Sequence, residues 1–297
     1  MRRSLLIAFF CLACLGVNAQ TMQFLNVSAN PRTSAFAGAA VAVDAGATAV
    51  DDNLAAASFS ESRVEVALGY GLWQPRCSRT EVMSAGGFAR LGDRFSIGAS
   101  MRNFVEPSYD IYTEDGLVGD SFAPKEKAFG LGVSYRFLDC LSVGLSAKLA
   151  SSSLAKSASA RAVCADVTLS YRQGPVRAGA ALCNLGGKVD YGTGTSYSLP
   201  SVARAGAAVV ISGLTGSLEV DYSFSGAFSA AAGAEYCLAD IILLRLGAHY
   251  GDGKLSAPAY ACAGVGLRVF CLNLDASYIF ASETLGGSMC FSLGVRF

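Results

Sequence analysis

The sequence predicts an all-β protein, a transmembrane antiparallel β-barrel of about fourteen strands. From residue 62 onward, apolar and polar residues alternate in segment after segment, with the period of a β-strand. Short and long connections alternate between these segments, as they do in membrane barrels. Charged residues make up 15% of the chain and its mean hydropathy is +0.41, but no apolar run after the N-terminal region is long enough for a spanning helix.

Residues 1–19 have the pattern of a signal peptide. Arg2 and Arg3 precede the apolar run 5–16, and small residues follow up to Ala19, which predicts cleavage before Gln20. Two alternatives stay open, an uncleaved anchor helix and a lipoprotein attached through Cys14. The run is short for about 30 Å of hydrocarbon, which disfavours the anchor helix.

Residues 20–61 lack clean alternation and are expected to form a hatch or plug before the barrel, with a short helix inside the lumen. The stretch 32–50 is rich in Ala and Gly, and Asp44 and Asn53 are its candidate polar residues. The alternative is a disordered periplasmic extension. The apolar character of the segment disfavours this alternative, because disordered tails are usually polar.

The barrel itself is expected over residues 62–297. An even number of strands places both of its ends on the periplasmic side. We expect strands at 62–73, 79–91, 94–107, 126–137, 140–153, 160–172, 175–184, 202–212, 214–224, 227–237, 240–250, 259–269, 271–281 and 287–297.

The connections between the expected strands support a membrane barrel. Four of them are tight and alternate with the long links 108–125 and 185–201, whereas a short link at 225–226 breaks the pattern. The tight ones are Gly92-Asp93, Leu138-Asp139, Gln173-Gly174 and Ser212-Gly213. A soluble β-sandwich or β-helical protein is the alternative. The polar face of Gly, Ser and Ala mixed with both charge signs favours a narrow, crowded lumen.

Alternation places many charged side chains in the lumen, since a Lys or Arg facing lipid at mid-bilayer costs about 2–4 kcal/mol. Both charge signs occur there, which predicts either a salt-bridged filling or a polar permeation path. The candidate lumen residues are Arg102, Arg136, Glu219, Asp221, Arg245, His249, Arg268 and Asp275.

The last expected strand ends the chain with its apolar face toward lipid. Phe291, Leu293, Val295 and Phe297 share that face. The terminal aromatic residue resembles the strand signal of outer-membrane proteins in general, which implies recognition by the barrel-assembly machinery. Outer-membrane lipids are the other expected partner.

The chemistry-bearing residues favour no enzyme. His249 is the one histidine of the chain, and no HxxxH, GxSxG or phosphate-binding loop is present. A Ser–His site across strands is the alternative, which loss of activity in His249→Ala would reveal. A formal net charge of zero gives no support to a nucleic-acid partner.

Eight cysteines follow the leader, and none forms a CxxC pair. We therefore predict neither a metal site nor a cofactor. Most of these cysteines lie in expected strands, where Cys acts as a small apolar residue. A two-residue turn at Gln173-Gly174 would place Cys164 opposite Cys183, so a disulfide between them is a hypothesis.

Several short motifs, taken in order, resemble the PorV/PorQ family of outer-membrane proteins. The family's Asn-Pro-Ala step before the first strand reads Asn53-Leu54-Ala55 here, without the proline. The matching segments are 24–26, 34–42, Asp44, 184–188, 199–200, 204–206, 234–236, 244–247, 264–267 and 292–297.

The resemblance implies a FadL-like barrel with an N-terminal hatch in the outer membrane of a Gram-negative, Bacteroidetes-like cell. It also implies an interaction or shuttle role in type IX protein secretion, with secretion-channel subunits or cargo C-terminal domains as partners. The alternative function is FadL-like transport of small hydrophobic molecules, and a general porin is a more distant one.

Overall fold

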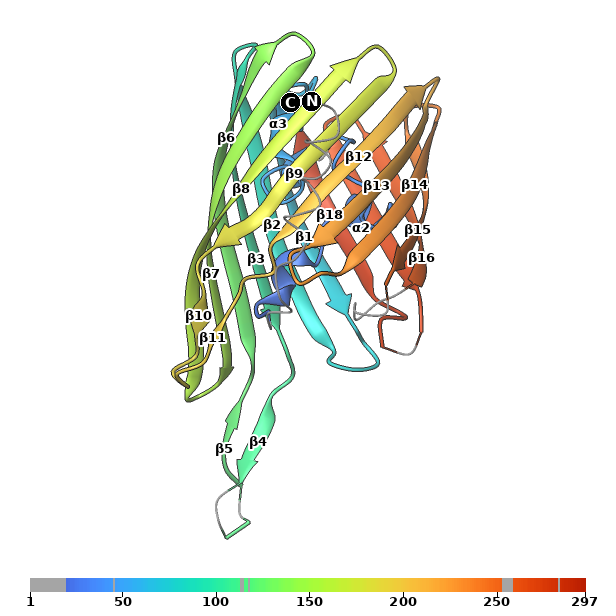
Figure 1. The fold of residues 1–297 in the computed structure, drawn as a ribbon. Coiled ribbons are helices and arrows are strands. Elements are labelled where there is room, and N and C mark those ends of the chain that lie inside the picture. The colour runs from blue at the N-terminus through green and yellow to red at the C-terminus, as the bar shows by residue number, and fades with distance from the viewer. Residues whose placement is uncertain (1–19, 45, 113–114, 117, 253–258, 283) are drawn as a thin grey trace.

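The computed structural model describes residues 20–297, except 45, 113–114, 117, 253–258 and 283. The expected signal peptide at 1–19 lies outside the described residues. The described chain forms a closed antiparallel barrel of fourteen strands (Figure 1). The last strand pairs with the first, with Arg296 opposite Glu65, and this pairing closes the ring.

All fourteen predicted strands are confirmed, and their ends differ from the predicted ones by at most two residues. The ring consists of β1 (Val64–Trp73), β2 (Thr80–Leu91), β3 (Phe95–Val105), β6 (Lys125–Leu138), β7 (Leu141–Ala155), β8 (Ala158–Gln173), β9 (Val176–Gly186), β12 (Val202–Ile211), β13 (Leu214–Ser223), β14 (Phe228–Leu238), β15 (Ile242–Gly251), β16 (Ala259–Val269), β17 (Leu272–Phe280) and β18 (Met289–Arg296).

The two ends of the barrel differ in their connections. One end, called the turn end here, carries the start of β1, the end of β18 and a series of short turns. The first of these turns joins β2 to β3. The opposite, loop end carries the hairpin of β4 (Tyr109–Tyr112) and β5 (Val118–Phe122), which projects beyond the barrel (Figure 1). The pair β10 (Val189–Asp190) and β11 (Ser196–Tyr197) lies in the link between β9 and β12.

Alternation sorts the side chains onto the two faces of the wall. The outer face is strongly apolar, and Leu68, Leu218 and Leu246 are each more than 60% exposed there. Small, polar and charged side chains face inward and are largely buried, as with Glu219 and Arg245. This distribution is that of a barrel whose outer surface contacts hydrocarbon.

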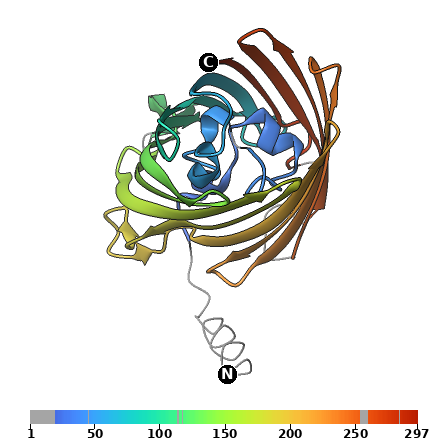
Figure 2. The ribbon, with the colours of Figure 1, turned by 90° about the horizontal axis from the view of Figure 1, so that it is seen from above.

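The described residues of 20–61, called the inner segment here, lie inside the ring (Figure 2). The segment contains η1 (Gln23–Asn26), α2 (Pro31–Ala35), η2 (Gly46–Thr48) and α3 (Leu54–Ala57). It starts at the loop end, where the Thr21 N–H donates to the Ser198 carbonyl at 3.0 Å, and it enters β1 at the turn end. No helix of the described residues is long and apolar enough to cross a membrane.

Local sequence explains the helices of the inner segment. The Asn30 side chain accepts from the Arg32 N–H, and Pro31 occupies the first helical position of α2, where a missing N–H has no cost. Asn53 likewise caps α3 by accepting from the Ala55 N–H. Both helices have only four or five residues, so the surrounding wall rather than helix propensity holds them.

Glycines of the wall let the inner segment pack against it. A Cβ added at Gly179 would lie 2.6 Å from the carbonyl carbon of Val41, and one at Gly247 would lie 2.6 Å from that of Phe36. Such contacts are too short for any side chain. The Gly-rich polar face of the strands is therefore a packing surface for backbone.

The hypothesis of a disulfide between Cys164 and Cys183 is wrong, because both cysteines are free. The turn between β8 and β9 consists of residues 174–175, one position later than expected, and a bulge follows between Ala165 and Val167. Cys164 consequently lies opposite Gly186 instead of Cys183.

Candidate functional site

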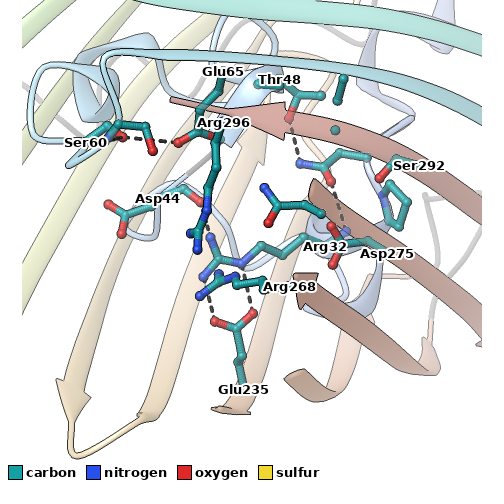
Figure 3. Close-up of a pocket in the computed structure, with 18 of the residues that line it drawn as sticks. Arg32, Asp44, Thr48, Ser60, Glu65, Glu235, Arg268, Asp275, Ser292 and Arg296 are labelled. Carbon is teal, nitrogen blue, oxygen red and sulfur yellow. Dashed lines mark hydrogen bonds and ion pairs between the residues drawn. The ribbon is translucent and has the colours of Figure 1, made fainter. Parts of the chain in front are cut away.

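A cavity of about 490 Å³ opens between the inner segment and the wall toward the turn end (Figure 3). Its lining comes from the inner segment and from nearly every side of the barrel, and it is rich in charge. The charged residues that line it are Arg32, Asp44, Glu61, Glu65, Arg172, Arg177, Glu235, Asp240, Arg245, Arg268, Asp275 and Arg296. We call it the turn-end cavity.

A chain of ion pairs crosses this cavity. The guanidinium group of Arg32 donates to both carboxylate oxygens of Glu235, at 2.8 and 3.0 Å. Arg245 donates to Glu235 at 2.6 Å and to Asp275 at 2.5 Å. The side chains of Glu235 and Arg245 are 6% and 1% exposed, so their charges depend on each other for compensation. The network holds α2 against β14, β15 and β17.

A second ion-pair group involves Asp44, the acidic residue expected in the hatch. Arg172 at the end of β8 donates to both of its carboxylate oxygens at 3.1 Å, and Arg177 on β9 donates at 2.5 Å. Burial raises the pKa of Asp44, but the charges of Arg177 and Arg172 outweigh burial and hold the pKa below its ordinary value. Asp44 therefore fixes the inner segment at the turn end.

Two arginines of the turn-end cavity have no such partner. Arg268 and Arg296 both project into it (Figure 3), and neither side chain has an ion pair within the described part of the chain. Glu65 lies beside Arg296 and accepts a hydrogen bond from Ser60 at 3.2 Å. The cavity thus holds free charge of both signs, which favours hydration over an apolar ligand.

A smaller cavity of about 130 Å³ lies toward the loop end, again between the inner segment and the wall. Asp221, His249 and Tyr260 line it from β13, β15 and β16, and Arg102 and Arg204 line it from β3 and β12. His249 stacks on Tyr260, with ring centroids 4.6 Å apart. We call it the loop-end cavity.

Several buried polar atoms around the loop-end cavity lack a hydrogen-bond partner among the described residues. They are Nε of Arg102, Nε of Arg204, Oδ1 of Asp221 and Nδ1 of His249. A polar cavity of this size has room for several water molecules, which would satisfy such atoms. The loop-end cavity is therefore suited to water.

Asp52 lines the loop-end cavity. Its Oδ2 accepts hydrogen bonds from Thr33 at 3.0 Å, from Thr48 at 2.8 Å and from Asn30 at 3.3 Å. Burial raises the pKa of Asp52, although these hydrogen bonds oppose the rise. This carboxyl ties residues 30–33 of the inner segment to residues 48–52.

A third feature of the lumen is an apolar cluster at the loop end. Phe24 of the inner segment packs edge-on against Phe104 of β3, with ring centroids 5.4 Å apart. Trp73, the one tryptophan of the chain, packs against the cluster from β1. The apolar cluster consists of Met22, Phe24, Leu25, Ala29, Val82, Phe104, Ala128, Ala150, Ala160, Cys164, Val189, Tyr191 and Leu199.

A buried polar network borders the apolar cluster. Lys148 on β7 and Asp166 on β8 form an ion pair of 2.5 Å, and each side chain is 2% exposed. The Asn184 N–H donates to Asp166 at 2.7 Å, and the Asn184 side chain donates to Asn26 of the inner segment at 2.8 Å. Asp166 next to the bulge thus holds the Asn184 backbone, and the Asn184 amide reaches the start of the inner segment.

The structure divides the expected lumen residues between the two cavities. Arg102, Asp221 and His249 line the loop-end cavity, whereas Arg245, Arg268 and Asp275 line the turn-end cavity. His249 and Arg245 therefore belong to different cavities.

The remaining expected residues have contacts of their own. Glu219 accepts from the Val41 N–H at 2.7 Å, and the Arg136 guanidinium lies over the Phe59 ring. The Asn53 side chain donates to the Val41 carbonyl at 2.6 Å. Phe291, Leu293 and Phe297 are exposed on the outer face, and Val295 is half-buried.

The sequence analysis missed Arg32, Glu235, Asp52 and Phe24. Glu235 lies directly opposite Arg245 across the β14–β15 hairpin, so a correct turn assignment would have identified that pair. Arg32, Asp52 and Phe24 form their contacts within or through the irregular inner segment. No periodicity signals such contacts.

No family model and no curated protein matches this sequence. Solved structures do match. The toluene transporter TodX of Pseudomonas putida has a TM-score of 0.70 and 13% identity over 96% of this chain and 99% of its own. The toluene transporter TbuX of Ralstonia pickettii has a TM-score of 0.69 and 14% identity over 90% of this chain and 98% of its own. A FadL homologue of Pseudomonas aeruginosa has a TM-score of 0.61 and 12% identity over 94% of this chain and 99% of its own. The chain shares the fold of these FadL-like barrels.

Proposed function

We propose that this protein is an outer-membrane barrel that takes up small hydrophobic molecules through its loop end. The observation that carries the proposal is the apolar cluster, in which Met22, Phe24 and Leu25 of the inner segment fill an apolar chamber of the wall. The shared fold supports it, because two of the similar structures are named toluene transporters.

The chamber has the composition of a hydrocarbon site. Aromatic and aliphatic side chains dominate its lining, as in most small-molecule sites. Phe24 presents a ring to Phe104 and is 4% exposed, so it occupies the place that an aromatic ligand would take. A ligand enters when residues 22–25 withdraw from the chamber.

Trp73 provides the test, since it is the one tryptophan and packs against the apolar cluster. Toluene is titrated into the purified, detergent-solubilised protein while tryptophan emission is followed. We expect a saturable change in emission. Phe24→Ala should strengthen binding, because it empties the place of one ring and removes the competitor.

Phe129→Ala is the matched control, because Phe129 is 47% exposed on the outer face of β6. Its toluene response should equal that of the wild type. A folded wild-type protein with no saturable response, or a Phe24→Ala response equal to that of Phe129→Ala, would contradict the proposal. Cells that express the barrel should also accumulate labelled toluene faster than cells that lack it.

A second candidate function is an interaction role in type IX secretion, implied by the PorV/PorQ resemblance. The hairpin of β4 and β5 favours it, because it projects beyond the barrel with Tyr112 63% and Val118 61% exposed (Figure 1). If the hairpin binds secretion-channel subunits or cargo C-terminal domains, replacing 109–122 with a short Gly-Ser turn should abolish their co-purification. Unchanged co-purification from outer membranes would count against this role.

Under either function the barrel depends on outer-membrane lipids and on the barrel-assembly machinery. We propose these as its general partners, on the basis of the apolar outer face and the terminal strand.

A further inference from the structure

The two polar cavities share part of their lining. Ala29, Asn30, Thr48 and Ser84 border both of them. The loop-end cavity begins at Tyr260, next to the loop end of β16, and the turn-end cavity reaches Arg296 at the turn end of β18. Together they follow most of the length of the barrel, and the four shared residues form a septum between them.

Small side chains close the septum, and hydrogen bonds hold them in place. The Asn30 amide donates to the Thr48 hydroxyl at 2.6 Å, and Thr48 donates to Asp52 at 2.8 Å. Toward the wall, the Ser84 hydroxyl donates to the Ala29 carbonyl at 3.4 Å, a long hydrogen bond. The septum is therefore hydrogen-bonded within the inner segment, and the Ser84–Ala29 bond that links it to β2 is a long one.

The chemistry on both sides of the septum suits water and ions. Arg268 and Arg296 below it have no ion-pair partner among the described residues, and Arg204, Asp221 and His249 above it carry unpartnered buried polar atoms. Positive and negative groups line both cavities, so an ion of either sign meets a compensating charge on either side.

From this geometry we propose that the two cavities are the halves of one polar path for water and small inorganic ions, gated at the septum of Ala29, Asn30, Thr48 and Ser84. The path borders the apolar cluster at Leu25 and Ala29, whereas the wall residues of that cluster come from β2, β3, β6, β7 and β8. The inference goes beyond uptake of hydrophobic molecules and does not depend on it.

The test is conductance of the purified full chain in planar lipid bilayers in potassium chloride. The double variant Asn30→Ala/Thr48→Ala removes the two septum side chains that project from the inner segment. We expect a several-fold higher single-channel conductance than in the wild type. Ser84→Leu, which fills the septum from the wall, should conduct no more than the wild type.

Ser58→Ala is the matched control, since Ser58 donates or accepts a 2.8 Å hydrogen bond with Ser134 of the wall and borders neither cavity. It should conduct like the wild type. Heat-modifiable mobility and protease protection of residues 20–61 establish that each variant is folded with its inner segment in place.

A folded double variant with wild-type conductance would overturn the proposal. Equal increases in the double variant and in Ser58→Ala would overturn it as well, because general loosening would then explain the current. The toluene response of Trp73 is measured on the same samples. Failure of the conductance test with an intact toluene response therefore refutes the polar path alone.

Discussion

Arg32 and Glu235 lie 203 positions apart in the chain, yet the Arg32 guanidinium donates hydrogen bonds to both carboxylate oxygens of Glu235, at 2.8 and 3.0 Å. Glu235 also accepts from Arg245 at 2.6 Å. One wall carboxylate therefore serves an arginine of the wall and an arginine of the inner segment. Bidentate geometry of this kind is the strongest form of ion pair, so it fixes the position of α2 inside the barrel.

Replacing Arg32 should loosen the inner segment and leave the barrel intact. In Arg32→Ala, Glu235 keeps Arg245, so the loss is about that of one charged hydrogen-bonded group, roughly 1.5–3 kcal/mol of docking free energy. Chymotrypsin should cleave within residues 20–61 faster than in the wild type, while heat-modifiable mobility persists. Arg268→Ala is the control, because Arg268 lines the same cavity without an ion pair in the described chain. Equal cleavage of the two variants would refute this role.

A methyl group at Gly179 should displace the inner segment. Its Cβ would lie 2.6 Å from the Val41 carbonyl carbon, and a backbone cannot yield as a flexible side chain does. Overpacking of this kind costs about 1–3 kcal/mol. Gly216→Ala on β13 is the control, since nothing lies within 4 Å of its Cβ. Thermal unfolding in detergent should show a lower midpoint for Gly179→Ala only, and equal midpoints would contradict the packing argument.

The sequence predicted the barrel well because each strand carries its own signal. In β18 the residues Phe291, Leu293 and Val295 alternate with polar or small ones, and the hydrocarbon outside imposes that period directly. The inner segment has no such solvent boundary, since it faces wall on all sides. Its apolar composition indicated that it lies in the lumen, but it did not predict the positions of its helices or their contacts.

The register between neighbouring strands limited how much of the site could be predicted. The turn between β8 and β9 was predicted one residue too early, which placed Cys164 opposite Cys183. The observed turn and the bulge place Cys164 opposite Gly186 instead. The inward direction of Arg245 and Asp275 followed from alternation. Their partners depend on how strands and inner segment align, which periodicity alone does not contain.

Acid should weaken docking of the inner segment through Asp44. Its pKa is lowered in the folded protein, so its pairing with Arg172 and Arg177 stabilises docking fully above its ordinary value of 3.8 and is lost as the pH falls through the lowered value. The Asp44 side chain is 39% exposed, so solvent screening keeps the contribution below about 1 kcal/mol. Hydrogen exchange of residues 20–61 should be faster in Asp44→Asn than in the wild type at neutral pH. The difference should vanish once the pH falls below the lowered pKa of Asp44; a difference independent of pH would exclude Asp44 as the cause.

Truncating Phe297 should reduce the amount of assembled barrel. Phe297 directly follows the closing strand β18. Its N–H donates to the Val64 carbonyl at 2.9 Å and the Val64 N–H donates back at 3.1 Å, and its ring is 71% exposed on the outer face. The ring thus adds little to internal packing and is available to the machinery that recognises the last strand. In Phe297→Ala we expect less heat-modifiable protein in outer membranes and an unchanged unfolding midpoint of the fraction that does assemble.

Phe270→Ala separates recognition from simple loss of an aromatic surface. Phe270 is 96% exposed at the same end of the barrel, but it lies in the turn between β16 and β17 and not on the closing strand. Its assembled amount should match the wild type. Equal loss in both variants would make the effect one of lipid contact, and no loss in Phe297→Ala would remove Phe297 from the assembly signal, leaving Phe291 and Leu293 as the residues to test next.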